Sequence, residues 1–137
     1  MTQFAFLQRE FTAVFESAAR AEAAINADPR AACFYARRAL ELAVAWAYKY
    51  DTALKLPYEQ NLSALIHEPS FKKAAGEAVF NKARIIVTLG NRAVHSHRPI
   101  AAQDALVAMR ELFHVAYWLA RSYGRIPRLL GYPRNAR

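Results

Sequence analysis

Apolar residues recur every three or four positions in four long stretches of this chain, which is the spacing of amphipathic helices. In the first stretch these residues are Phe4, Leu7, Phe11, Val14, Phe15, Ala18 and Ile25. The second stretch is rich in alanine, which favours close packing of another backbone against it. No alternating strand pattern and no internal repeat is found. The pattern therefore predicts helices over residues 4–25, 29–50, 71–89 and 99–123, with 29–50 as the central helix.

Residues that commonly start and end helices lie between these stretches. Asp28 precedes Pro29, a pair typical of an N-cap followed by the first helical position. Residues 51–60 have no helical period, so we expect a loop there. Residues 61–68 form a short helical piece that Pro69 ends, and Ser70 is expected to cap the next long helix.

The third long stretch is followed by a polar connector. Gly90 and Asn91 are the residue types that most easily adopt a left-handed backbone at a helix end, so the helix is expected to stop there. Arg92, His95, His97 and Arg98 follow, and Pro99 is expected to begin the last helix. If the chain has a polar site, this connector is where it is expected.

These elements predict an all-α fold, an antiparallel bundle of four main helices with a short extra helix. A chain of 137 residues is long enough for one such core but not for two. We assign the bundle to residues 1–124 and a basic tail or linker to residues 125–137, where the helical period is lost.

The positive charge is concentrated in two segments. The formal net charge is +8, and residues 125–137 contribute four arginines and no acid. Residues 72–98 hold six lysines and arginines with Glu77 as their one acid, a local charge of +5. A basic surface of this kind favours an acidic partner such as nucleic acid. A solvated face that only aids solubility is the alternative.

Cysteine content and the start of the chain favour the cytoplasm. Cys33 is the single cysteine and cannot form an internal disulfide, which fits a reducing compartment. It is interpreted as a small core residue. The first residues carry charges where an export signal needs an apolar centre, and no apolar run is long enough to span a membrane.

Two chemistries were considered for the connector. General acid–base cleavage of RNA needs a base, an acid and a cation, which His95, His97 and Arg92 provide in kind. Binding of phosphates without catalysis is the other. It would use a larger set of cations, namely Arg92, Arg98, Lys72, Lys73, Lys82 and Arg84. Two histidines without a nearby cysteine or acid do not predict a metal site, and no cofactor is expected.

Glu41 leaves two structural alternatives open. It lies three residues after Arg38 and four after Arg37, so an ion pair within the helix is one interpretation. The other is that Glu41 points inward toward the connector, where a carboxylate would raise the pKa of a histidine. In a purely structural role for the connector, Asn91 would cap the helix, Arg92 would pair with a helix C-terminus or with Glu41, and His95 would form a hydrogen bond across the bundle.

Four blocks of sequence, in order, resemble a known family. They are DPRAACFYARRALELA at residues 28–43, LKLPY at 54–58, NLSAL at 61–65 and LGNRAVHS at 89–96. Together they are similar to the N-terminal helical domain, of unassigned function, of type I restriction enzyme R subunits. The resemblance covers about residues 4–124. It implies a front domain of a longer site-specific deoxyribonuclease with an ATP-dependent helicase motor. Its partners would be nucleic acid, other restriction-modification subunits or downstream domains.

That family is in turn similar to the HEPN superfamily, small helical bundles that often dimerise and often cleave RNA. Their motif is an arginine, four residues, then a histidine. If Asn91 and His95 are aligned with that motif, its arginine falls on Gly90, whereas Arg92 and His97 satisfy the spacing in another register. The resemblance therefore implies a non-catalytic module that contacts nucleic acid or a partner subunit, with a homodimer as a further expected association. The alternative is a metal-independent ribonuclease that uses Arg92 with His95 or His97.

Overall fold

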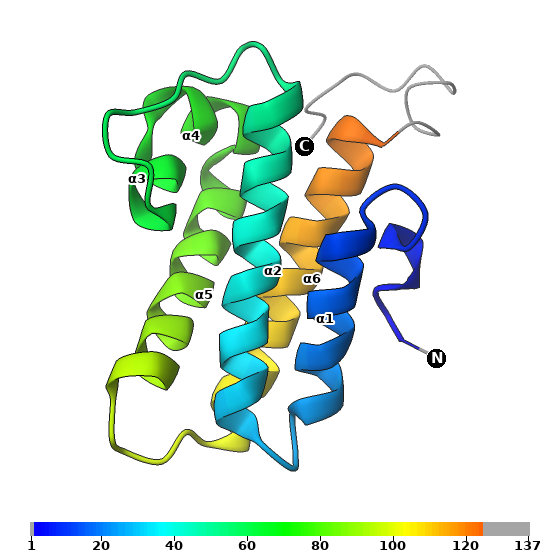
Figure 1. Cartoon of the computed structure of the whole chain (residues 1–137), viewed down its shortest axis with the longest axis vertical. Helices are drawn as coiled ribbons and strands as arrows, with labels where there is room; N and C mark the ends of the chain where they lie inside the picture. Colours follow the sequence, from blue (N-terminus) through cyan, green and yellow to red (C-terminus); the bar gives the residue numbers. More distant parts are fainter. Residues whose placement is uncertain (1, 125–137) are drawn as a thin grey trace.

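Four long helices, α1, α2, α5 and α6, run side by side along the molecule (Figure 1). The computed structural model describes residues 2–124, so the expected tail at 125–137 lies outside the described residues. The elements are, in chain order, η1 (Ala5–Leu7), α1 (Thr12–Ala24), α2 (Pro29–Tyr50), α3 (Leu62–His67), α4 (Pro69–Ala75), α5 (Glu77–His95) and α6 (Ala102–Tyr123). No strand occurs among the described residues, and the predicted all-α bundle is confirmed.

The α2 helix lies at the centre of the bundle, as its alanine content predicts. It packs against α1, α5 and α6. Its small residues are buried at these contacts, namely Ala32, Ala36, Ala39, Ala43 and Ala47. Both of its predicted ends are confirmed, and the Asp28 carboxylate accepts a hydrogen bond from the Ala31 N–H at 3.1 Å. Cys33 is buried in the same core, as expected.

The predicted helix over residues 4–25 is wrong in its first half. A 3-10 turn and further turns precede α1, which begins only at Thr12. Phe4, Leu7 and Phe11 are all buried nonetheless. Residues three apart also share a face in a 3-10 turn, so the apolar spacing does not distinguish that turn from the start of an α-helix.

The predicted helix over residues 71–89 is also wrong, because Gly76 divides it. Gly76 has φ of +83° and separates α4 from α5. That backbone conformation is strained for a residue with a side chain. The cap of α4 is Glu68 rather than Ser70, since the Glu68 carboxylate accepts from the Ser70 N–H at 2.6 Å.

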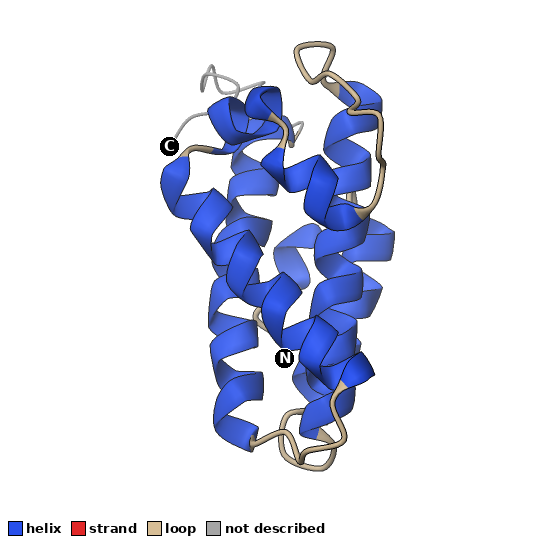
Figure 2. Ribbon diagram, turned by 90° about the vertical axis from the view of Figure 1, so that its left-hand side faces the viewer, coloured by secondary structure: helices blue, strands red, loops and turns tan. Residues whose placement is uncertain are grey.

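The bundle has two distinct ends. One end holds the turn from α1 to α2 and the connector from α5 to α6, and the short helices α3 and α4 lie beside α5 at the other end (Figure 1). Figure 2 shows the loops gathered at these two ends, with helix between them. Within residues 2–124, every helix is too short or too polar to cross a lipid bilayer.

Candidate nucleic-acid interface

The polar connector is shorter than predicted because α5 continues past Gly90. The helix ends at His95, where the Ser96 N–H donates to the Arg92 carbonyl at 2.9 Å. The predicted stop at Gly90 and Asn91 is therefore wrong, and Asn91 does not cap a helix end. The last helix begins at Ala102 rather than at Pro99. Arg92 and His95 thus lie in the last turn of a regular helix.

Gly90 serves packing between helices rather than a helix end. It is buried in the interface with α2, where the aliphatic part of Arg37 lies across it. A Cβ on Gly90 would lie 2.4 Å from the Cβ of Arg37, closer than two carbon atoms can approach. The absence of a side chain at this position allows the two helices to come together.

Arg30 holds the end of α5 and the connector in place. From the first turn of α2 its guanidinium donates to the carbonyls of Ala93 and Arg98, and to the carbonyl of Ser96 at 2.9 Å. The last carbonyls of a helix have no partner within the helix, and a cation there also meets the negative end of the helix dipole. Arg30 therefore fixes the backbone that presents the connector side chains.

Sequence reasoning missed Arg30. The available signal is its place in the first turn of the helix predicted to be central, directly after Pro29. In an antiparallel bundle that turn lies beside the end of another helix. Which helix lies there cannot be read from the local pattern.

The side chains of the connector face solvent. Arg92, His95, His97 and Arg98 are all exposed, and we refer to these four residues as the basic end. Arg92 lies 3.8 Å from the Asp104 carboxylate, a long and partly exposed contact. Exposed ion pairs of this kind contribute about 0–1 kcal/mol, so Asp104 holds Arg92 only weakly. Residues 78–103 contain no aspartate or glutamate, so Asp104 is the first acid after the basic end in the chain.

The other predicted cations do not gather at the basic end. Lys72 and Lys73 belong to α4, beyond the far end of α5, which is about 27 Å long at 1.5 Å per residue. Arg84 is exposed midway along α5, with its guanidinium over the Phe80 ring at 5.6 Å. Lys82 donates to the Glu111 carboxylate at 3.1 Å.

Glu41 is paired along its own helix. Its carboxylate accepts from the guanidinium of Arg38, three residues earlier, and both side chains are exposed. The inward-pointing alternative, in which Glu41 meets the connector, is therefore wrong. Its consequence, a carboxylate beside a connector histidine, has no support in this geometry.

The basic end presents chemical groups of the kind that bind anions. Exposed guanidinium and imidazole groups on a fixed backbone suit phosphate oxygens. Among residues 2–124, no three side chains of histidine, cysteine, aspartate or glutamate come together in a group that could hold a metal ion. The histidines and Arg92 do provide the groups that acid–base cleavage of RNA requires in kind.

Comparison with known proteins identifies a family but no activity. Searches of curated proteins and of solved structures found no significant match. The family model described as a domain of unknown function, DUF4145, matches residues 19–127, which is most of the chain and includes α2, α5, the basic end and α6. The chain therefore belongs to the DUF4145 family.

Proposed function

We propose that this domain is a non-catalytic binding module that contacts nucleic acid through its basic end. The observation that supports this most is the exposure of Arg92, His95, His97 and Arg98 on a backbone that Arg30 holds in place. Order in the backbone lowers the entropy cost of binding. The four block resemblances favour a place at the front of a type I restriction R subunit. In that setting the anionic partner is DNA or RNA handled by the parent enzyme, and neighbouring subunits are further partners.

Charge reversal at the basic end tests the proposal. In Arg92→Glu/Arg98→Glu we expect affinity for a fluorescent DNA duplex or RNA strand to fall about tenfold or more. The slope of log K against log salt should also fall by about two, because each lost phosphate contact releases one counterion fewer. Fluorescence anisotropy across a salt series measures both quantities. Arg84 is left unchanged, so its contribution can be tested separately.

The matched control is Lys72→Glu/Lys73→Glu, which makes the same change in net charge at the opposite end of α5. We expect this control to bind within about twofold of the wild type, apart from a small long-range effect that salt screens. An equal loss in both double variants would mean that only total charge matters, and the basic end would not be the contact surface. Circular dichroism confirms that each variant is folded.

A metal-independent ribonuclease is the second candidate, and the exposure of His95 and His97 within five residues of Arg92 favours it. In this mechanism one imidazole accepts the 2′-hydroxyl proton, the other donates to the leaving oxygen, and Arg92 stabilises the charge on the phosphate. The test is cleavage of labelled RNA in the presence of a chelator by the wild type, His95→Ala and His97→Ala. Activity that survives both substitutions excludes these histidines. No cleavage by the wild type supports the binding module.

A further inference from the structure

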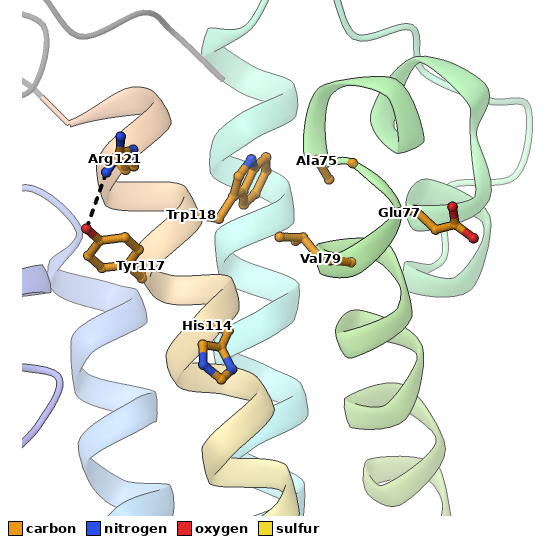
Figure 3. Close-up of a pocket in the computed structure, with 9 residues that line it drawn as sticks. Ala75, Glu77, Val79, His114, Tyr117, Trp118 and Arg121 are labelled. Carbon is orange, nitrogen blue, oxygen red and sulfur yellow. Dashed lines mark hydrogen bonds between the residues drawn. The ribbon is translucent and has the colours of Figure 1, made fainter. Parts of the chain in front are cut away.

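Two hollows lie one after the other between α5 and α6, and we refer to the strip of surface that holds them as the groove. The first has a volume of about 360 Å³ and is lined mainly by apolar groups, with Val79 from α5 and Tyr117 and Trp118 from α6 (Figure 3). The second has a volume of about 460 Å³ and is lined by Ile85 and Leu89 with Arg84, Arg92 and Val107.

The distance between the two hollows matches the distance between two side chains that are nearly three turns apart in an α-helix. Val79 and Leu89 mark them and are ten residues apart in one helix, which is about 15 Å or nearly three turns. An α-helix lying along the groove can therefore place one apolar side chain in each hollow. Recognition of an amphipathic helix by a groove with spaced apolar anchors is a recurring mode of binding.

Large apolar side chains are exposed along the same face. Ile85 is 39% exposed, Leu106 is 50% exposed and Tyr117 is 51% exposed. Phe6 lies edge-on to Tyr117, with ring centroids 6.5 Å apart, and extends the apolar surface beyond α6. Large exposed apolar side chains that gather on one face are typical of protein contact sites.

The acids between the hollows are neutralised within the domain. Glu111 lies between them and is almost fully buried, where it accepts from Lys82 and from Arg110, both at 3.1 Å. Asp104 faces Arg92 at the far end of the second hollow. A negatively charged partner therefore meets no unpaired carboxylate in the middle of the groove.

Cations line both hollows. Arg84 and Arg92 line the second hollow. The first hollow is lined by Arg121 and by the start of α5, whose N-cap Gly76 has no side chain to bond the first N–H groups. The start of a helix carries partial positive charge. The carboxylate of Glu77 points away from the other labelled side chains of this hollow (Figure 3).

From these observations we propose that the groove between α5 and α6 docks an acidic amphipathic helix of a partner protein. The apolar face of that helix fills the two hollows, and its flanking glutamates or aspartates meet Arg84, Arg92 and Arg121. The positive charge of the groove selects against a second copy of this chain, because a copy docked groove to groove would bring the like charges of Arg84 and Arg92 together. It also makes a basic helix a poor occupant.

The test is a display library of helical peptides with fixed leucines at i, i+3, i+4, i+7 and i+11 and flanks randomised among Glu, Gln and Lys. The library is selected on the full chain. We expect glutamate to be enriched over lysine in the flanks. In Ile85→Glu/Tyr117→Glu the affinity for a selected peptide should fall about tenfold or more, as when apolar anchors of an interface are lost. The absence of enrichment, or equal enrichment of both charges, overturns the proposal.

A matched control is available because Tyr50 and Leu56 are also large, apolar and exposed, at 52% and 61%, at the end of α2 and in the loop after it. Tyr50→Glu/Leu56→Glu should bind the selected peptide within about twofold of the wild type, since these residues lie outside the groove. An equal loss in both double variants overturns the proposal. Circular dichroism verifies that both are folded.

Two further measurements identify other occupants and separate this proposal from nucleic-acid binding. We expect the chain alone to be monomeric in sedimentation equilibrium. A dimer that the substitutions Ile85→Glu/Tyr117→Glu dissociate would assign the groove to a second copy. Affinity for nucleic acid in the same variant should fall less than in Arg92→Glu/Arg98→Glu. A larger fall would assign the groove to nucleic acid and overturn the peptide proposal.

Discussion

Gly90 of α5 lies directly against the side chain of Arg37 of α2. The Cβ that any other residue would carry at position 90 would lie 2.4 Å from the Cβ of Arg37 and 2.6 Å from its Cδ. The Cβ of Arg37 is fixed to the backbone of α2 and cannot turn aside. Relief of the overlap would therefore require the two helices to separate. Glycine is required here for space, in a helical backbone that any residue could adopt.

The first prediction is that Gly90→Ala destabilises the domain. In a helix interior, alanine is ordinarily about 1 kcal/mol more favourable than glycine. Overpacking of a tight contact costs about 1–3 kcal/mol, and a clash with the backbone-linked atom of a neighbouring helix belongs at the upper end of that range. We expect a net loss of about 1–2 kcal/mol in the free energy of unfolding, measured by urea denaturation.

Thr88→Ala, at an exposed position of the same helix, is the control and should lose no stability. A Gly90→Ala variant as stable as the wild type would show that the helices separate at no cost.

Glycines 76 and 90 show what could and could not be predicted from the sequence. Both lie in one long apolar stretch, and we expected Gly76 inside a helix and Gly90 at its end. The structure reverses the two roles, with a helix break at Gly76 and helix on both sides of Gly90. The choice depends on tertiary contacts, above all on Arg37, which is more than fifty residues away in the chain. By contrast, the start of α2 was predicted correctly because Asp28 and Pro29 act locally.

The second prediction concerns Arg30, whose guanidinium bonds three carbonyls at the end of α5 and in the connector. Arg30→Ala removes these bonds and leaves carbonyls of the last turn without a partner. A hydrogen bond to a charged group contributes about 1.5–3 kcal/mol to the free energy of unfolding. Because exposure to solvent lowers this contribution, we expect the loss in Arg30→Ala to lie at the lower end of that range. We expect faster amide hydrogen exchange in residues 93–98 and a fall in nucleic-acid affinity, although Arg30 contributes no side chain to the basic end.

The control for Arg30 is Arg38→Ala, which breaks the exposed ion pair with Glu41 and should change stability by about 0.5 kcal/mol or less. Arg30→Lys keeps the charge but cannot reach three carbonyls at once. Arg30→Lys should therefore restore only part of the protection of these amides from hydrogen exchange. Unchanged exchange in Arg30→Ala would mean that packing alone orders the connector.

The candidate site was predicted in part. The sequence places Arg92, His95, His97 and Arg98 close together within seven residues, and their exposure follows from their polar side chains. The predicted helix over residues 71–89 already places Lys72 and Lys73 at the end opposite the connector, and the structure keeps them there, in α4 before the break at Gly76. The sequence does not show that Lys82 pairs with Glu111, on a helix nearly thirty residues later.

The third prediction is a pH dependence from Glu111. Burial raises the pKa of Glu111, but the hydrogen bonds and charges of Lys82 and Arg110 outweigh it and hold that pKa below its ordinary value of 4.5. A carboxylate with a lowered pKa in the folded state contributes stability that is present above about pH 4.5 and is lost as the pH falls through the folded pKa. Urea midpoints from neutral to acid pH should therefore depend less steeply on pH in Glu111→Gln than in the wild type. Equal slopes would show that Glu111 does not contribute to acid destabilisation.

The last prediction is that Cys33 is unreactive in the folded domain and reports on its unfolding. Burial raises the pKa of the Cys33 thiol, and the charge of Asp104 raises it further, against the opposing charges of Arg92 and Arg30. Since the thiolate is the reactive form, alkylation by iodoacetamide should be slow until the chain unfolds.

If global unfolding is what exposes the thiol of Cys33, its labelling rate follows the unfolded population and rises about tenfold for each 1.4 kcal/mol of destabilisation. Gly90→Ala should then label faster by the factor that its urea denaturation gives, and Thr88→Ala should not. Rapid labelling of the wild type under native conditions would contradict both the burial of Cys33 and the close packing of α2 in the core.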